Sequence, residues 1–232
     1  TPKPDTNAKP GVETTAAPPP KLEVLVAVAR RDVVTFYQRA AEAAGVKLVA
    51  LGLLPSASAR CVHACKVVES GQAYGLISLR PDEVGIDIVA DEAVPFSRGA
   101  SVKPPTEPGA ADAFVNAATI EVVRSLHSYS GLGAAGALAK LFVAGATGHE
   151  ADVVAALATR VSTPVALLDL AALDLPEDFH PAAAGATAGI GLALGFADAG
   201  GLPFDFLNPK RPAVQRDLRR IKILAGLAVA AV

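Results

Sequence analysis

The sequence predicts an α/β protein whose mixed β-sheet is covered by helices. Hydrophobic residues make up 51% of the 232 residues and aromatic residues only 5%, which is typical of helices and strands packed through small side chains. Short β-branched and apolar runs alternate with longer segments of helical periodicity, as expected for strands covered by helices. Three consecutive runs have no helix between them, which predicts antiparallel strands in the same sheet.

The amino-terminal part is expected to hold a linker, a strand, a helix and a second strand. Residues 1–20 are rich in proline and threonine and have no apolar period, which predicts a disordered linker. Residues 21–29 and 46–54 are apolar runs that predict strands. Between them, residues 31–45 predict a helix that ends at Gly45. The face of this helix expected in the core contains Val33, Val34, Tyr37, Ala40, Ala41 and Ala44.

The middle of the chain predicts a helix followed by a β-meander. The helix covers residues 55–70, with Pro55 near its start, and Gly71 ends it. The meander strands are expected at residues 73–80, 83–90 and 93–98, before a proline-rich loop at 101–109. Asp87 alternates with apolar neighbours in the second strand, so we expect its side chain to face solvent.

The remaining elements repeat the alternation of helix and strand. We expect a long helix at residues 110–131, a strand at 140–145, a helix at 151–162, a strand at 164–170 and a glycine-rich helix at 185–197. The core face of the long helix is expected to contain Phe114, Ala117, Ala118, Ile120, Val123 and Leu126.

Several kinds of site are excluded or disfavoured by composition and motif. A net charge of −2 gives no field that would attract nucleic acid. Cys61 and Cys65 flank His63, but this histidine points away from the face that the two cysteines share, and a second ligand pair is missing. We therefore expect buried thiols on a helix. None of the common nucleotide-binding, zinc-protease or serine-hydrolase motifs is present, and we assign no catalytic or metal-binding residue.

One strand-turn-helix segment has the geometry of a phosphate loop. Gly145 and Gly148 flank Ala146 and Thr147 between the strand at 140–145 and the following helix. Backbone amides at such a turn can point toward an anion. Glycine is also common in strand-to-helix turns that bind nothing, so both interpretations stay open.

The carboxy-terminal segment combines an apolar-aromatic peptide, a basic cluster and an apolar run. Phe204, Phe206 and Leu207, with Asn208 and Pro209, form an extended anchor strip in which neighbouring prolines discourage helix. The basic cluster, typical of a cytoplasmic membrane flank, contains Lys210, Arg211, Arg216, Arg219, Arg220 and Lys222. Residues 223–232 are about half as long as the roughly 20 residues a bilayer span needs. They predict either the start of a membrane helix or a buried or amphipathic terminal helix.

Five segments in order resemble the carboxy-terminal part of the PilM-like, actin-like proteins of type IV pilus assembly, relatives of FtsA. The segments are residues 25–60, 75–99, 120–131, 141–173 and 183–195. They include the Glu-x-x-Arg-Ser-Leu-x-x-Tyr helix, which begins at Glu121, and the loop from Gly145 to Gly148. The chain lacks methionine and begins with Thr1, so we expect it to be part of a longer protein.

The resemblance implies a partial actin-like, ribonuclease H-like lobe, and we expect the chain to have four parts. These are a linker at 1–20, the actin-like domain at 21–200, a docking peptide with a basic segment at 201–222, and the start of a truncated transmembrane helix at 223–232. It also implies a nucleotide site at Gly145, Ala146, Thr147, Gly148 and Ser78, with ATP and magnesium as the possible ligands of the full-length protein. Where the family has Asp-x-Gly, this chain has Ser78, Leu79 and Arg80, which removes a carboxylate and a glycine; we therefore expect ATP hydrolysis to be lost.

The function implied is a scaffold at the cytoplasmic face of the bacterial inner membrane. It would couple an actin-like domain of a pilus or secretion machine to inner-membrane assembly proteins, with the peptide from Phe204 to Pro209 docked on its own or a neighbouring domain. A nucleotide-dependent ATPase of the actin and sugar-kinase superfamily, or an FtsA-like cell-division protein, is the alternative.

Overall fold

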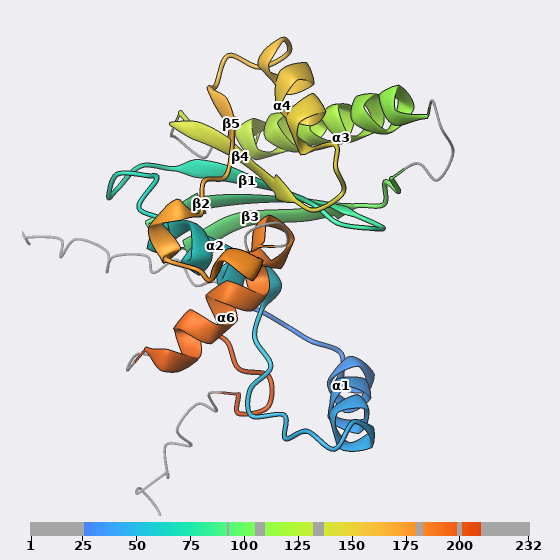
Figure 1. The fold of residues 1–232 in the computed structure, drawn as a ribbon, viewed down its shortest axis with the longest axis vertical. Coiled ribbons are helices and arrows are strands. Elements are labelled where there is room, and N and C mark those ends of the chain that lie inside the picture. The colour runs from blue at the N-terminus through green and yellow to red at the C-terminus, as the bar shows by residue number, and fades with distance from the viewer. Residues whose placement is uncertain are drawn as a thin grey trace, which may run out of the picture.

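The computed structural model describes residues 26–91, 93–104, 110–131, 137–179, 183–198 and 201–209, which form one mixed sheet with helices on both faces (Figure 1). The strands are β1 (Tyr74–Leu79), β2 (Val84–Ala90), β3 (Ala93–Ala100), β4 (Lys140–Gly145) and β5 (Val165–Leu167). The α-helices are α1 (Arg31–Ala43), α2 (Leu54–Ala64), α3 (Ala111–Gly131), α4 (Glu150–Ala158) and α6 (Thr187–Ala197). Three 3₁₀ turns complete the described elements: η1 (Ala171–Leu173), η2 (Glu177–Phe179) and η3 (Ala184–Ala186). The predicted α/β class is confirmed.

The sheet has the strand order β3-β2-β1-β4-β5. β1, β2 and β3 are antiparallel neighbours, as the absence of a helix between them predicted. β4 runs parallel to β1, and β5 runs parallel to β4. Because β1 and β4 point the same way and pair Leu79 with Gly145, the loops that follow them meet at one edge of the sheet.

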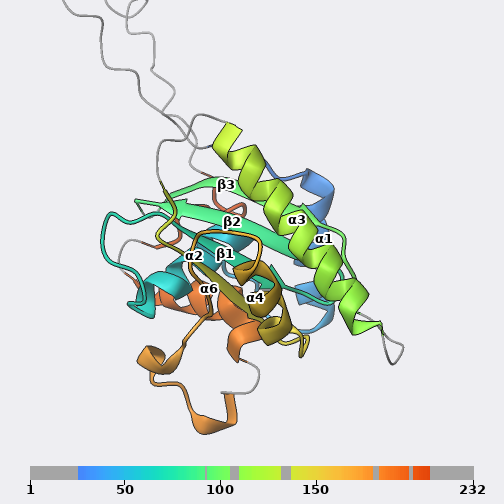
Figure 2. The same cartoon turned by 90° about the horizontal axis from the view of Figure 1, so that it is seen from above.

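Each face of the sheet has its own apolar core. On one face Leu76 and Phe142 pack with Val62 of α2, and α6 crosses α2 on that side. On the other face Ile77 packs with Val122 of α3 and with α4 (Figure 2). The sheet is therefore covered on both sides, and its three central strands are almost wholly buried.

The two cysteines lie buried on α2 as free thiols, as predicted. The Cys65 thiol donates to the carbonyl oxygen of Cys61 at 3.1 Å. Burial raises the pKa of Cys61 to about 12, so this thiol is poorly suited to act as a nucleophile or metal ligand. Among the described residues, no group of three or more His, Cys, Asp or Glu side chains could hold a metal ion.

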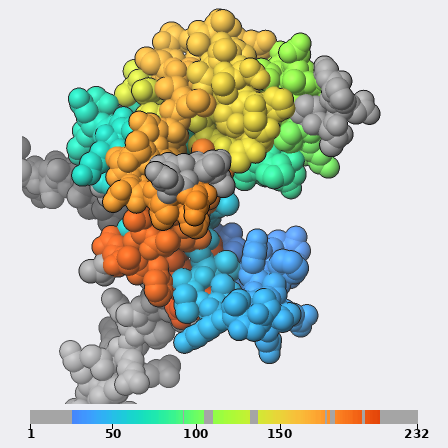
Figure 3. All heavy atoms as spheres, viewed as in Figure 1, coloured from blue at the N-terminus to red at the C-terminus, as the bar shows by residue number. Residues whose placement is uncertain are grey.

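The two strands predicted before α2 are not formed in the described residues. Residues 26–30 and 46–53 are extended but lie outside the sheet, and residues 21–25 are outside the described part. The predicted core face of α1 is also wrong, because the helix buries no residue, and Phe36 is 65% exposed. Figure 3 shows α1 in a lobe below the sheet. An apolar run becomes a strand only where a neighbouring backbone pairs with it, and the described residues of these runs pair with none of the five strands.

Three further expectations need correction. α2 ends at Ala64 and not at residue 70, because Lys66 takes a left-handed conformation with φ of 55°. Asp87 is 2% exposed and does not face solvent, because β2 is covered on both faces and alternation with apolar neighbours no longer reports exposure. On α3 the buried face is rotated from the predicted one, so that Ala117 and Ile120 are only half-buried.

Candidate functional site

The candidate site is an open cleft where β1 and β4 end. Its volume is about 470 Å³, and it is lined by Leu79, Arg80, Pro81, Pro104, Ala146, Thr147, Gly185 and Ala186. The parallel pairing of β1 with β4 brings the turn after Ser78 beside the loop that begins at Gly145. Two segments that the sequence marked separately thus meet in space, and η3 closes a third side.

The amides of the Gly145–Gly148 loop are engaged by a carboxylate of the chain itself. The backbone N–H and the hydroxyl of Thr147 both donate to Oε1 of Glu150 at 2.7 Å, and the N–H of Gly148 donates to Oε2 at 3.0 Å. Partial burial by itself raises the pKa of Glu150, but these hydrogen bonds outweigh it and hold the pKa below its ordinary value. Glu150 therefore carries a negative charge where a phosphate group would have to bind.

Two glycines of the cleft serve close packing. A side-chain carbon at Gly145 would lie 2.7 Å from the carbonyl oxygen of Leu79 on the neighbouring strand. A side-chain carbon at Gly185 would lie 2.8 Å from the side chain of Ala146. These contacts explain why glycine is needed at both positions without a ligand, which is one of the two interpretations that the sequence left open.

Ser78 belongs to a buried polar layer beside the cleft. It does not line the cleft, and its hydroxyl oxygen has no hydrogen-bond partner within the described part of the chain. Asp87 lies on the same face of the sheet and accepts a hydrogen bond from the hydroxyl of Ser97 at 2.7 Å, while its Oδ2 has none. Arg80, two residues after Ser78, lines the cleft and forms an ion pair with Glu83.

Phosphate and magnesium do not fit the donors and acceptors of this cleft. The loop amides of Thr147 and Gly148 are taken by Glu150. The nearest buried carboxylate is Asp87, and burial, which is the largest influence, raises its pKa against the opposing effects of Ser97 and Arg80. A carboxyl group held toward its neutral form is a poor magnesium ligand. As far as the described residues line it, the cleft has the size of a small-molecule site but lacks the chemistry for a triphosphate.

The segment 201–209 folds back onto the chain. The N–H of Phe206 donates to the carbonyl oxygen of Leu51 at 2.9 Å, and the N–H of Leu51 donates to Oδ1 of Asp205 at 3.1 Å. A side-chain carboxylate thus takes the place of a second backbone carbonyl in a short two-strand contact. Phe204 and Leu207 are half-buried in this arrangement, whereas Asn208 and Pro209 are exposed.

Asp205 is the residue of this segment that the sequence analysis missed. Its carboxylate also accepts from the N–H of Leu207 at 3.0 Å and from the side-chain amide of Asn208 at 2.9 Å. Slight burial raises its pKa, but these hydrogen bonds prevail and lower it. The signal was an aspartate followed by asparagine and proline, a pattern typical of a side-chain-stabilised turn.

α2 and α6 support the same segment from the other side. Arg60 of α2 forms an ion pair with Asp198 at 2.8 Å and donates to the carbonyl oxygen of Gly201 at 3.2 Å. Gly52 approaches Leu192 of α6 so closely that a side-chain carbon there would lie 2.7 Å away. The segment is thus held by both helices and by residues 51–52.

The basic cluster and the apolar run after Pro209 lie outside the described residues. This applies to Lys210, Arg211, Arg216, Arg219 and Arg220, whose predicted membrane-flanking role stays a prediction. Within the described ranges, no helix combines the length and the apolar character needed to cross a bilayer.

Comparison with known proteins shows the fold. No protein-family model and no curated protein matches the chain. Among solved structures, the chain is similar to a PilM-PilN type IV pilus biogenesis complex, with 12% identity and a TM-score of 0.55 over 72% of this chain and 58% of the other. It also matches a Bacteroides thetaiotaomicron protein with an actin-like ATPase fold and unknown function, with 10% identity and a TM-score of 0.32 over 48% of this chain and 38% of the other. The chain shares its α/β fold with the first of these neighbours and spans less than two thirds of the length of either.

Proposed function

We propose that this chain is part of a non-catalytic, actin-like scaffold at the cytoplasmic face of the bacterial inner membrane. In this proposal residues 21–200 are the actin-like domain, and residues 1–20 are a linker. Residues 201–222 are a docking peptide with a basic flank, and residues 223–232 begin a membrane helix. The scaffold couples a type IV pilus or related secretion machine to inner-membrane assembly proteins.

The observation that carries the proposal is the docked segment 201–209. An aromatic peptide without helix is held by backbone pairing at Leu51 and by the carboxylate of Asp205. Backbone pairing with side-chain anchors is a general way in which domains hold extended peptides. A tether in the same chain keeps the local concentration of such a peptide high.

The solved neighbour supports the kind of machine. Its printed name describes a complex of PilM with PilN in type IV pilus biogenesis, and its fold is shared with this chain. By that likeness, the partner proposed here is an inner-membrane assembly protein with a short cytoplasmic peptide. The apolar-aromatic character of Phe204, Phe206 and Leu207 fits the same kind of contact.

Hydrogen exchange of the full chain tests the docking. In Phe206→Ala the hydrogen-bonded amides of Leu51, residue 206 and Leu207 should exchange at least tenfold faster, because the half-buried Phe206 side chain is removed. The amides of β1 and β4 should not change. Phe196→Ala is the matched control, since Phe196 is 66% exposed on α6 and outside the contact.

A second experiment tests the coupling itself. A fluorescent peptide with the sequence of residues 204–211 should bind Phe206→Ala more tightly than the parent, because the chain's own segment no longer competes. Binding that is undetectable with both proteins would remove the scaffold proposal.

A nucleotide-dependent function is the second candidate, favoured by the position and size of the cleft. Calorimetry with ATP and magnesium separates it from the scaffold. We expect no binding by the parent chain, because Glu150 occupies the loop amides. Binding by the parent that is lost on adding bulk at Gly185 would instead favour the nucleotide-dependent function.

A further inference from the structure

β3 is an edge strand of the sheet. In the described sheet it pairs only with β2, so its outer row of N–H and C=O groups faces no other strand. An exposed edge of this kind can accept an extended chain as an additional strand. Pro95 has no backbone N–H, so the part of β3 available for unbroken pairing is the stretch that follows it, up to Ala100.

A groove lies between the end of β3 and the middle of α3. Its volume is about 490 Å³. The two elements touch through Phe96 and Tyr129, whose ring centroids are 5.9 Å apart, and the groove lies further along β3, around Ala100. Its apolar lining is Ala100, Val102, Ala117 and Ile120. The last two are among the α3 residues that the sequence placed in the core and that are only half-buried.

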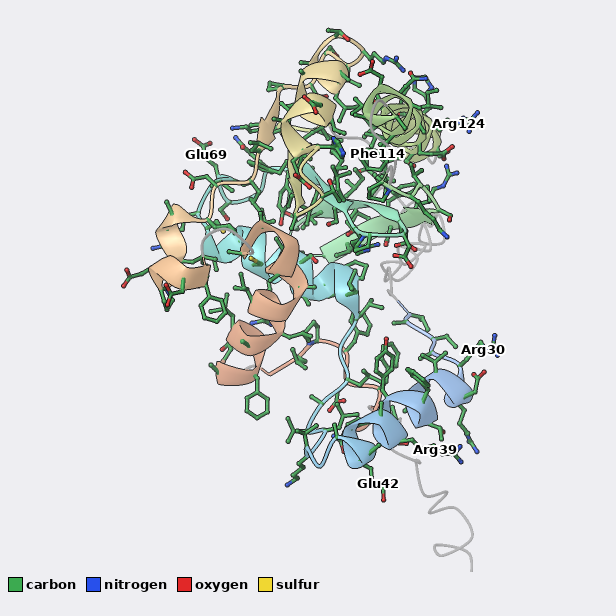
Figure 4. The ribbon with its side chains drawn as sticks, turned by 45° about the vertical axis from the view of Figure 1, so that its right-hand side comes forward. Arg30, Arg39, Glu42, Glu69, Phe114 and Arg124 are labelled. Atoms are coloured by element: carbon green, nitrogen blue, oxygen red, sulfur yellow. The ribbon has the colours of Figure 1, made fainter. Side chains whose placement is uncertain are left out.

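The rim of the groove has an excess of positive charge. Glu121 of α3 accepts from Arg98 of β3 at 3.1 Å and from Arg124 at 2.6 Å, so one carboxylate is shared by two guanidinium groups. The Arg98 and Arg124 side chains are 40% and 65% exposed, whereas Glu121 is 18% exposed. Figure 4 shows Arg124 projecting from the outer side of α3.

The other side of the β3 edge holds a carboxylate that is already paired with Arg80. The carboxylate of Glu83 lies within 2.8 Å of the position that a side-chain carbon at Gly99 would take. Gly99 and Arg98 are consecutive on β3, so their side-chain positions are on opposite faces of the sheet. An added strand would therefore meet arginines on the α3 side and the Arg80–Glu83 ion pair on the other.

We propose that the β3–α3 groove binds an extended acidic peptide of a partner protein by strand addition. Its backbone pairs with the free edge of β3, and one apolar side chain enters the lining between Ala100 and Ile120. On the same face of the peptide, carboxylates two positions from this apolar side chain meet Arg98 and Arg124. On the other face of the peptide, neutral side chains lie toward Glu83. This site is separate from the segment 201–209 and does not depend on the proposed scaffold function.

A defined probe tests the proposal on the full chain. The probe is a fluorescent peptide with a central valine and a glutamate two positions to either side of it. Threonine fills the alternate positions. We expect saturable binding in fluorescence anisotropy at low salt that weakens as salt is raised, because exposed charge pairs are screened. Replacing both glutamates by lysine should weaken binding at least tenfold. Methylating the backbone nitrogens that would pair with β3 should abolish binding.

Charge reversal on the protein completes the test. Arg124→Glu should weaken binding of the glutamate peptide about tenfold, and it should leave the fold intact because this side chain is mostly exposed. Arg39→Glu is the matched control, an equal change of charge on exposed α1 (Figure 4). Equal binding of the methylated and unmethylated peptides would overturn strand addition. Equal binding of the peptide by the parent and by Arg124→Glu would overturn the site. If anionic vesicles displace the peptide and the methylated peptide still binds, the arginines at the rim are assigned to a membrane surface instead.

Discussion

Asp87 is a carboxyl group inside the interface between the sheet and the α2–α6 layer. Its one hydrogen bond comes from Ser97, and burial raises its pKa. Folding therefore favours the protonated form of Asp87. Its contribution to stability is fully present below the ordinary aspartate pKa and is lost as pH rises through the folded-state pKa.

Asp87→Asn should remove the loss of stability that Asp87 causes as pH rises. The free energy of unfolding should rise by about 1–2 kcal/mol at pH 7, because the variant keeps an acceptor for Ser97 and carries no charge to bury. Urea denaturation between pH 4 and pH 8 measures it, and the parent should lose more stability than the variant across that window. Asp82→Asn, at an exposed turn residue, is the control. Parallel pH profiles for parent and Asp87→Asn would contradict the prediction.

Glu150 illustrates how one side chain decides what a loop can do. Gly145 to Gly148 form a turn whose amides could serve an anion, and the sequence left both that role and a packing role open. The carboxylate three residues after Thr147 caps the loop from within the first turn of α4, an arrangement related to a helix capping box. A sequence signal existed, since Thr147 and Glu150 have that spacing.

At the scale of elements, the crossing of α2 and α6 depends on one glycine. A side-chain carbon at Gly191 would overlap the carbonyl group of Ala57 on α2, so the two backbones touch there. Gly189, on the same helix, has open space around the same position. Of these two glycines of α6, packing requires Gly191 but not Gly189.

The two positions give a matched pair of variants. Gly191→Ala should lower the free energy of unfolding by about 3 kcal/mol or more, because one of two backbones must move. Gly189→Ala should leave stability unchanged or raise it by up to about 1 kcal/mol, through helix propensity alone. Urea denaturation measures both. Similar losses in the two variants would mean that the close contact at Ala57 is not what sets the crossing.

Some strands follow from the local sequence, whereas tertiary pairing decides whether other apolar runs become strands. The meander β1–β2–β3 and the buried strand β4 follow from apolar runs that find neighbours, and they were predicted nearly to the residue. The runs at 21–29 and 46–54 have similar composition, yet their described residues lie outside the sheet. For the second run, the described backbone pairing is at Leu51, with the segment 201–209, which composition cannot reveal.

On the scale of the whole molecule, apolar residues are unevenly distributed between a dense sheet core and an exposed α1. Phe142 is 1% exposed in the centre of the sheet, whereas Phe36 is 65% exposed. The same residue type should therefore matter very differently in the two places.

Phe142→Ala should lower the free energy of unfolding by about 3–5 kcal/mol through lost burial and a cavity. Phe36→Ala should change it by less than about 0.5 kcal/mol, since surface substitutions have small effects. Thermal and urea denaturation of both variants provide the measurement. A loss of more than about 1 kcal/mol in Phe36→Ala would show that α1 is packed in solution.

Sequence alone determined the class of this protein and most of its sheet. Periodicity and small-residue composition depend on local chemistry, and they predicted the meander, β4, α3 and the buried cysteines. They also marked Gly145–Gly148 and Phe204–Pro209 as segments of interest, although their roles as binding sites stay predictions.

Tertiary structure decided the rest, because burial and pairing depend on which distant segments become neighbours. It placed Asp87 inside the protein, rotated α3 so that Ala117 and Ile120 border a groove, and left α1 exposed. It also brought Asp205 to Leu51 across most of the chain, a contact that no local pattern contains.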